Sequence, residues 1–260
     1  MILFNNMILP QAEFSEELLR TGLNIYEVVR VFNGKPIFLK DNLTRLANSL
    51  KKSNIPLEVE KLNIADKLKH LIELKKMQEG NIKYVLHFDS DQMDECIYQI
   101  PHHYPSFQDY QKGVPTLTYE ITRKNPEVKY INEELRTLTN QLIADHNVYE
   151  ILLVDQEGYI TEGSRSNVFF IKDQILYTSP TAYVLPGTSR KRVFEICQKH
   201  NYSIVEQRID FHSLEQYDSV FLTGTSPLIL PINQINTIRY AVDTPFLRQL
   251  MDHYFALLEK

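Results

Sequence analysis

Residues 158–170 read Gly-Tyr-Ile-Thr-Glu-Gly-Ser-Arg-Ser-Asn-Val-Phe-Phe, the most informative segment of the chain for its architecture. Apolar residues near its two ends enclose a run of small and polar residues, a pattern typical of two strands joined by a short turn. We therefore expect strands at 159–161 and 167–171. Outward from them, further strands are expected at 150–155 and 175–177, so this part of the chain is predicted to be rich in hairpins.

The first part of the chain carries a separate pattern of strands and helices. Asn33-Gly34 is a strong hairpin-turn signal between extended segments at 28–32 and 37–39. Alternating apolar residues predict another strand at 82–88, with a hairpin partner at 96–100. Apolar residues at helical spacing predict two amphipathic helices, the first opening near Asp41; they are Leu43, Leu46, Ala47 and Leu50, then Ile64, Leu68, Leu71 and Ile72.

Residues 102–115 resemble a connector between domains, since they contain Pro105, Gly113 and Pro115. Helices and hairpins are mixed along the chain without a regular strand–helix–strand alternation. We therefore predict an α+β fold of two domains. The smaller α+β domain is expected at 1–110 and the larger α+β domain at 111–260.

Composition excludes several classes of function. The 260 residues are 43% hydrophobic and 23% charged with a formal net charge of −5, which does not favour nucleic acid or an anionic membrane as partner. No apolar run approaches the roughly 20 residues that cross a bilayer, and the N-terminus lacks the basic segment of a signal peptide. Cys96 and Cys197 have no metal-like or disulfide-framework spacing. We expect a cytoplasmic protein without a metal, whose partners are small molecules.

Two clusters of small residues are candidates for binding an anion. Residues 185–190, Leu-Pro-Gly-Thr-Ser-Arg, precede a predicted helix at 188–200, whose first N–H groups and dipole favour a phosphate. An ordinary helix cap is the alternative. Residues 223–227, Thr-Gly-Thr-Ser-Pro, follow a predicted strand and offer hydroxyls and amides, although a simple turn has the same composition. Together the clusters favour a phosphorylated ligand.

The 158–170 stretch resembles the signature of the class IV aminotransferases, the fold-type IV pyridoxal 5′-phosphate enzymes. These include branched-chain and D-amino-acid aminotransferases and aminodeoxychorismate lyase. The resemblance covers nearly the whole chain, through Tyr26-Glu-Val-Val-Arg30, Asn42-Leu-Thr-Arg45-Leu46, residues 185–190 and residues 221–232. It implies the two-domain architecture of D-amino-acid aminotransferases and a homodimer.

The resemblance also implies roles for particular residues. Lys129, in a Lys-x-x-Asn pattern within the larger domain, corresponds to the catalytic lysine that binds the cofactor as a Schiff base and moves the substrate proton. Glu162 corresponds to the carboxylate that pairs with the pyridine nitrogen of the cofactor. The groups that correspond to phosphate ligands are Arg45, Thr188, Ser189 and Thr225. Those that correspond to substrate-binding positions are Tyr26, Arg30 and Arg123.

Departures from the family pattern leave the reaction open. Glu134 stands where branched-chain enzymes place a tyrosine, and residues 89–91 read Asp-Ser-Asp where D-amino-acid enzymes carry Arg-x-His. The main hypothesis is a transaminase that moves an amino group between an amino acid and a 2-oxo acid. The alternatives are a lyase that releases pyruvate from aminodeoxychorismate to give 4-aminobenzoate, and a cofactor-free binding homologue.

Overall fold

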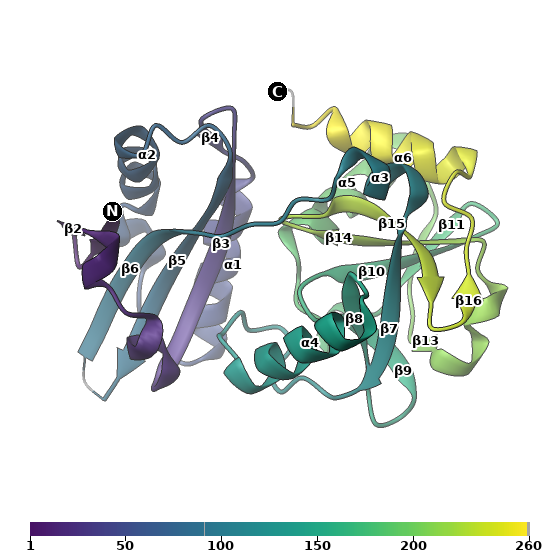
Figure 1. The fold of residues 1–260 in the computed structure, drawn as a ribbon, viewed down its shortest axis with the longest axis horizontal. Helices are drawn as coiled ribbons and strands as arrows, with labels where there is room; N and C mark the ends of the chain where they lie inside the picture. Colours follow the sequence, from purple (N-terminus) through teal and green to yellow (C-terminus); the bar gives the residue numbers. More distant parts are fainter. Residues whose placement is uncertain (91, 259–260) are drawn as a thin grey trace. The chain divides into compact units, whose positions relative to one another are not determined.

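The computed structural model describes residues 1–90 and 92–258, and the chain divides into two compact units (Figure 1). Unit 1 comprises Met1–His103 and Val128–Glu133, and unit 2 comprises Tyr104–Glu127 and Glu134–Lys260. Each unit contains a sheet and helices, so the predicted α+β class is confirmed.

This division differs in two respects from the expected 1–110 and 111–260. Unit 1 ends earlier because the supposed connector contains helix α3 (Phe107–Lys112), which a capping box starts: Ser106 and Asp109 each accept a backbone hydrogen bond from the other, at 3.2 and 2.7 Å. Lys129 belongs to unit 1 rather than to the larger unit. The reason is backbone pairing with strand β3 (Leu23–Phe32), where Tyr26 N–H donates to Lys129 O at 3.0 Å.

Unit 1 contains a six-stranded antiparallel sheet in the order β2-β1-β6-β5-β3-β4. Its longest strands are β3, β5 (Gly80–Asp89) and β6 (Gln92–Ile100). Asn33 and Gly34 both have positive φ angles, 50° and 71°, which confirms the predicted hairpin turn into β4 (Lys35–Pro36). The extended segment expected at 37–39 is wrong, because helix α1 (Leu39–Lys52) already begins there.

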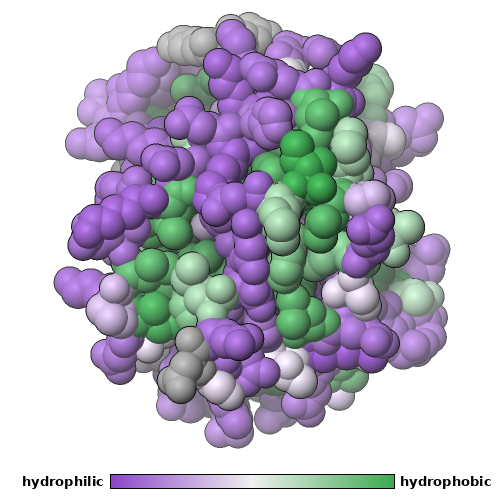
Figure 2. All heavy atoms as spheres, turned by 90° about the vertical axis from the view of Figure 1, so that its left-hand side faces the viewer, coloured by the Kyte–Doolittle hydropathy of each residue, from purple (hydrophilic) through white to green (hydrophobic). Residues whose placement is uncertain are grey.

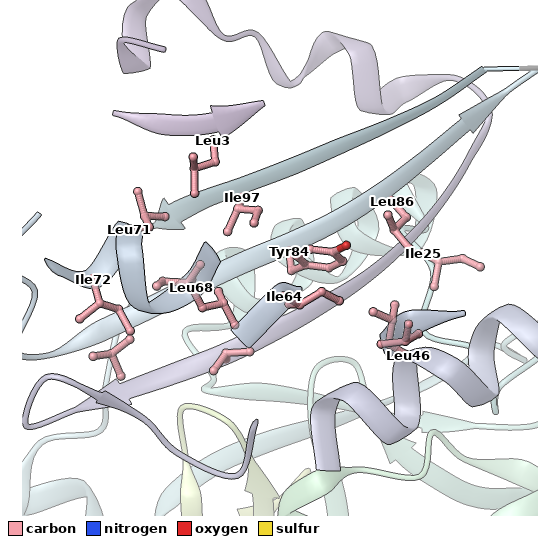
Figure 3. Close-up of a cluster of buried hydrophobic side chains, with 14 of the residues drawn as sticks. Leu3, Ile25, Leu46, Ile64, Leu68, Leu71, Ile72, Tyr84, Leu86 and Ile97 are labelled. Carbon is pink, nitrogen blue, oxygen red and sulfur yellow. The ribbon is translucent and has the colours of Figure 1, made fainter. Parts of the chain in front are cut away.

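The core of unit 1 lies between this sheet and its two predicted helices, α1 and α2 (Ile64–Leu74). Figure 3 shows side chains from both helices meeting those of the strands, among them Leu46, Leu68 and Leu71 against Ile25, Tyr84, Leu86 and Ile97. The opposite sheet face packs Val85, Cys96 and Tyr98 against residues of the N-terminal segment. Since neighbouring residues of a strand face opposite sides, Glu27 shares the helix-covered face with Ile25, and Tyr26 lies on the other face.

The N-terminal hairpin of β1 (Ile2–Phe4) and β2 (Met7–Leu9) was not predicted. Its turn is Asn5-Asn6, and both residues have positive φ angles. Met7 and Ile8 on this edge strand are 58% and 45% exposed. On the face drawn in Figure 2, hydrophobic side chains gather in two bands with hydrophilic side chains between them.

Unit 2 is built on a ten-stranded sheet that includes the predicted hairpins around 158–170. Its order is β12 (Ile204–Glu206), β11 (Ile175–Thr178), β10 (Asn167–Lys172), β14 (Ser219–Gly224), β15 (Leu228–Ile235), β7 (Val114–Glu120), β8 (Glu150–Val154), β9 (Tyr159–Gly163) and β13 (Ile209–Asp210), with β16 (Ile238–Arg239) also paired to β15. The strands at the two ends of this order, β12 and β13, follow each other closely in the chain. The sheet therefore curves round on itself.

Three longer helices pack on this sheet: α4 (Glu133–His146), α5 (Thr188–His200) and α6 (Pro245–Phe255). Phe169 of β10 stacks on Phe221 of β14 with ring centroids 5.1 Å apart, and its ring lies 6.2 Å from that of Phe194 in α5. These aromatic contacts fix α5 against β10 and β14.

Within the described ranges, no helix is long and apolar enough to span a membrane. The described side chains also contain no group of three or more His, Cys, Asp or Glu residues that could hold a metal ion. Cys96 and Cys197 are buried free thiols, and burial raises the pKa of each to about 12. Neither is therefore a reactive thiolate at neutral pH.

Candidate functional site

The loop between β9 and β10 is held by a buried carboxylate, Glu150, which no local sequence pattern marks. Glu150 accepts hydrogen bonds from Ser164 Oγ at 2.6 Å, Ser166 Oγ at 2.8 Å and Arg165 N–H at 3.2 Å. A Cβ on Gly163 would approach Ser166 Oγ to 2.2 Å, so a larger residue there would disturb the Ser166–Glu150 hydrogen bond. The small residues of the 158–170 stretch therefore make a tight turn that fixes the end of β9.

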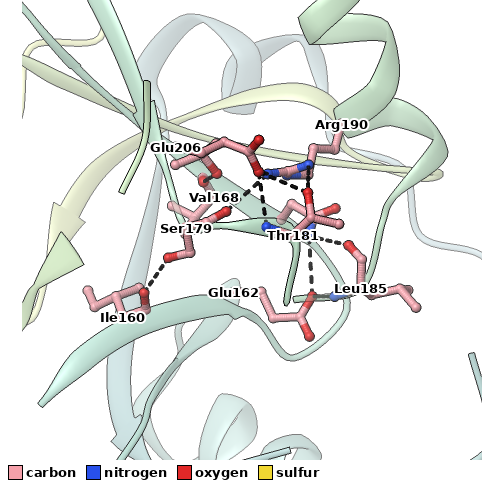
Figure 4. Close-up of polar contacts among 10 residues, drawn as sticks. Ile160, Glu162, Val168, Ser179, Thr181, Leu185, Arg190 and Glu206 are labelled. Atoms are coloured by element: carbon pink, nitrogen blue, oxygen red, sulfur yellow. Dashed lines mark hydrogen bonds and ion pairs between the residues drawn. The ribbon is translucent and has the colours of Figure 1, made fainter. Parts of the chain in front are cut away.

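Glu162 lies at that end of β9 and is only 2% exposed. Its Oε1 accepts a hydrogen bond from Arg123 Nη1 at 2.7 Å. Its Oε2 accepts a hydrogen bond from Leu185 N–H at 3.0 Å (Figure 4). The same oxygen accepts a hydrogen bond from Asn167 Nδ2 at 3.2 Å. A carboxylate surrounded by donors in this way has a fixed position and a fixed orientation.

Helix α5 begins beside this carboxylate without a side-chain cap. Its N-cap is Gly187, its first turn contains no acidic residue, and Thr188 and Ser189 are both buried. A Cβ at Gly187 would approach Asn167 Oδ1 to 2.1 Å, so a larger residue there would displace the Asn167 amide. The first N–H groups of a helix have no acceptors within it, so a buried, uncapped N-terminus of this kind suits an anion.

The 223–227 cluster contributes a second group in unit 2 that could donate a hydrogen bond to an anion, the Thr223 hydroxyl. Thr223, at the end of β14, is fully buried, and its Oγ1 makes no hydrogen bond within the described structure. Thr225 follows in the turn and is half-buried. A buried hydroxyl without a hydrogen bond costs free energy, so Thr223 Oγ1 suits a ligand that offers it an acceptor. Together with the uncapped start of α5, this hydroxyl makes the donors of unit 2 a suitable set for a phosphorylated ligand.

In unit 1, Arg45 forms a buried ion pair with Glu27. Arg45 Nε and Nη2 donate to the two carboxylate oxygens at 2.8 and 2.6 Å, and Asn42 Nδ2 donates to Glu27 Oε2 at 2.8 Å. Glu27 and Asn42 were not identified as site residues from the sequence. The alternating directions of strand side chains provide a signal for Glu27, because they place it on the face that α1 covers.

Lys129 and Tyr26, predicted for catalysis and for substrate binding, lie close together in unit 1. The backbone of Lys129 is fixed on both sides: its carbonyl accepts from Tyr26 N–H, and its N–H donates to Ser49 Oγ at 3.2 Å. Lys129 Nζ lies 4.7 Å from the centre of the Tyr26 ring, within cation–π distance, and Lys83 Nζ lies 5.5 Å from the same ring. Arg30 is buried on β3, two strand repeats beyond Tyr26 on the same face.

The positions that depart from the family pattern lie at exposed places. Glu134 is exposed in the first turn of α4, and Asp89 is exposed at the end of β5. Residue 91, the third of the Asp-Ser-Asp segment, lies outside the described residues. The structure thus groups Arg123 and Glu162 with the start of α5 in unit 2, and Lys129 with Tyr26 in unit 1.

Comparison with known proteins identifies the family. Residues 24–235 match the sequence model of amino-transferase class IV. A D-alanine aminotransferase of Bacillus licheniformis is 24% identical over 251 residues, which cover 90% of this chain and 88% of that protein. A branched-chain-amino-acid aminotransferase of Pseudomonas aeruginosa is 24% identical over 265 residues, covering 92% and 85%.

Solved structures show the same fold. The branched-chain amino acid aminotransferase of Escherichia coli superposes with a TM-score of 0.86 at 19% identity, over 99% of this chain and 94% of that one. A Legionella pneumophila protein described as a 4-amino-4-deoxychorismate lyase superposes with a TM-score of 0.81 at 23% identity, over 91% of each chain. The expected fold-type IV architecture is confirmed.

The family match covers far more than half of the chain and includes the 158–170 stretch. Class IV aminotransferases use pyridoxal 5′-phosphate, so the cofactor expected from the sequence is confirmed together with the family. The buried donors around Glu162 and at the start of α5 fit this cofactor, which carries a ring nitrogen and a phosphate. The chain belongs to the class IV aminotransferase family.

Proposed function

We propose that the protein is a transaminase, which moves an amino group from an amino acid to a 2-oxo acid with pyridoxal 5′-phosphate. The observation that carries the proposal is the buried Glu162 carboxylate, fixed by Arg123, Asn167 and Leu185 at the end of the signature strand. When bound, the cofactor supplies an electron sink for the negative charge that develops on the substrate Cα. Glu162 holds the proton of the ring nitrogen, which that electron sink requires.

The phosphate is assigned to the N–H groups of Thr188 and Ser189, the Thr225 hydroxyl and Arg45. Neutral donors at a helix start and a planar guanidinium suit a dianion, and arginine can bind it through two parallel hydrogen bonds. Glu27 and Asn42 keep the guanidinium plane of Arg45 in one orientation. Orientation before binding lowers the entropy lost when the phosphate is held.

Lys129 is assigned as the catalytic residue that bonds to the cofactor and transfers the proton from the substrate Cα. Both tasks require the amine to stay close to the reacting atoms. Hydrogen bonds to Tyr26 and Ser49 fix the backbone of Lys129, from which the side chain extends. Tyr26 and Arg30 are assigned to the substrate. Arg123 is assigned beside the cofactor ring, because its guanidinium is held on Glu162.

Two features favour a lyase as the second candidate. Glu134 replaces the tyrosine of branched-chain enzymes, and one structural neighbour is described as a 4-amino-4-deoxychorismate lyase. Under either activity we propose a cytoplasmic homodimer.

The experiment that tests the cofactor lysine compares wild type, Lys129→Ala and a control, Lys83→Ala, whose amine lies near the same tyrosine ring. Each protein is mixed with pyridoxal 5′-phosphate, its visible absorbance is recorded, and borohydride is added before peptide mass spectrometry. We expect a reduced adduct on Lys129 in wild type and in Lys83→Ala, and no adduct in Lys129→Ala. An adduct that maps to another lysine in wild type contradicts the assignment.

The reaction itself is tested by supplying amino acids of both hands with 2-oxo acid acceptors, and aminodeoxychorismate without an acceptor. A transaminase forms a new amino acid only when an acceptor is present. Pyruvate and 4-aminobenzoate formed from aminodeoxychorismate alone show the lyase instead.

A further inference from the structure

The loop of residues 179–187, between β11 and α5, connects to Glu162 through the backbone of Leu185. Leu185 N–H donates to Glu162 Oε2 at 3.0 Å, and Leu185 O accepts from Asn167 Nδ2 at 2.9 Å. Asn167 also donates to the same Glu162 oxygen. The position of the 179–187 loop therefore determines one side of the Glu162 hydrogen-bond shell.

The other end of this loop is held by Arg190, the third residue of α5 (Figure 4). Arg190 Nη2 donates to Ser179 O at 3.0 Å, and Arg190 Nη1 donates to Thr181 Oγ1 at 3.2 Å. Ser179 Oγ in turn donates to Ile160 O at 2.5 Å, which attaches the loop to strand β9. The strand that carries Glu162 and the helix that carries Thr188 and Ser189 are thus joined through one short loop.

Glu206 of β12 completes the arrangement. Its Oε1 accepts from Arg190 Nη2 at 2.7 Å, from Thr181 Oγ1 at 2.8 Å and from Thr181 N–H at 3.0 Å. A cation in the first turn of a helix is unfavourable next to the positive end of the helix dipole. Arg190 occupies that turn, so Glu206 supplies the negative charge that offsets the unfavourable placement.

We propose that Arg190 and Glu206 are positioning residues for the cofactor: their ion pair holds the 179–187 loop so that Leu185 N–H stays on Glu162. This inference rests on the proposed function of Glu162. Neither side chain touches the reacting atoms, so the ion pair acts through the loop. Loss of the ion pair weakens the Leu185–Glu162 hydrogen bond and also makes the start of α5 less rigid. Both changes lower the affinity for pyridoxal 5′-phosphate.

The test compares Glu206→Ala and Glu206→Gln with Glu195→Ala. Glu195 is a matched control because it also pairs with an arginine of α5, Arg192, and its side chain is 42% exposed against 39% for Glu206, yet it is not bonded to the loop. Two quantities are measured: hydrogen exchange of the 181–186 segment in ligand-free protein, and the Kd for pyridoxal 5′-phosphate by absorbance titration. Pro186 has no N–H, so only residues 181–185 contribute exchanging backbone amides to this segment, and one of these five is Leu185.

For Glu206→Ala we expect about tenfold faster exchange in 181–186 and about tenfold weaker cofactor binding, the effect of losing one charge-assisted hydrogen-bond set. Glu206→Gln, whose amide oxygen can still accept from Thr181, should stay within about threefold of wild type, and Glu195→Ala within about twofold. Partial rescue by glutamine distinguishes positioning from a general loss of packing.

Two results overturn the proposal. The first is unchanged exchange in 181–186 of Glu206→Ala. The second is faster exchange spread equally over unit 2, including β10, which shows global destabilisation instead. A wild-type protein that binds no pyridoxal 5′-phosphate overturns the proposed function itself, and that outcome is read from wild type alone.

Discussion

Two arginine–glutamate pairs with buried carboxylates, one in each unit, use the same residue types in opposite ways. In unit 1, Glu27 gives both oxygens to Arg45 and one of them also to Asn42. In unit 2, Glu162 gives one oxygen to Arg123 and the other to the neutral donors Asn167 and Leu185. The first carboxylate serves to orient an arginine, whereas in the second the arginine and the neutral donors orient a carboxylate.

The comparison shows that the other hydrogen bonds of a carboxylate distinguish an ion pair that fixes its arginine from one that fixes its carboxylate. Because both oxygens of Glu27 accept from Arg45, the guanidinium of Arg45 is fixed in one plane. At Glu162, donors from Arg123, Asn167 and Leu185 direct the carboxylate from several sides at once. Substitutions in the two pairs should therefore have their largest effects on different quantities: the free energy of unfolding for Glu27 with Arg45, and kcat for Glu162 with Arg123.

The largest effect is expected from Glu27→Gln. It leaves the buried Arg45 without a counter-charge, which costs roughly 3–5 kcal/mol in the free energy of unfolding. Urea unfolding followed by circular dichroism measures it. The double variant Glu27→Gln/Arg45→Met removes both charges and should recover most of the loss, so a single variant as stable as wild type breaks the comparison.

Next comes Glu162→Gln, which keeps the shape of the side chain and removes its charge. We expect kcat of the cofactor-saturated enzyme to fall by about 100-fold, since preorganised electrostatic groups of this kind are worth that much. Its free energy of unfolding should fall by less than that of Glu27→Gln. Steady-state kinetics beside urea unfolding checks both statements, and a kcat close to wild type contradicts the role of Glu162.

A smaller effect is expected from Gly187→Ala, which disturbs the neutral side of the Glu162 shell. The new Cβ would lie 2.1 Å from Asn167 Oδ1, so the Asn167 amide must move and its hydrogen bonds weaken. Cofactor affinity should fall by about tenfold. In an Asn167→Ala background the same substitution should add little, because the clash is gone; full additivity in absorbance titrations argues against this coupling.

The smallest effect concerns the partly exposed carboxylate of Glu206. Burial alone would raise its pKa, but hydrogen bonds from Arg190 and Thr181 outweigh burial and lower the pKa below the ordinary 4.5. A depressed pKa in the folded state stabilises the protein above the unfolded-state pKa, and this contribution is lost as pH falls through the folded-state pKa. The stability difference between wild type and Glu206→Gln should therefore be constant above about pH 5 and shrink below pH 4. A difference that grows on acidification contradicts this sign.

Local patterns were enough to predict much of the fold. The Asn33-Gly34 turn, the apolar stripes of α1, α2 and α5, and the strands on either side of Glu162 are all encoded within a few neighbouring residues. The strands on either side of the Asn5-Asn6 turn are only three residues long, too short for an alternation of apolar residues to mark them. Helix α3 was overlooked because its capping box lies in a segment that prolines and a glycine make resemble a linker.

The contacts that build the site were less accessible from sequence. Glu27, Glu150 and Glu206 are each fixed by groups distant in the chain, and a single glutamate in a strand carries no local sign of its partners. The resemblance to a family supplied Lys129 and Glu162 as predicted site residues. It did not supply the pairing of the Lys129 segment with β3, which depends on backbone hydrogen bonds across more than a hundred residues.

That pairing has a consequence for how the protein can be divided. Val128–Glu133 belongs to unit 1, yet the chain enters it from unit 2 and returns to unit 2 afterwards. No single cut of the polypeptide therefore separates the two units, and a cut between residues 103 and 104 leaves Lys129 on the fragment that lacks β3. Two fragments expressed from separate genes would have to associate through the 128–133 segment. The return of a fixed conformation at Lys129 would therefore show that the fragments have associated.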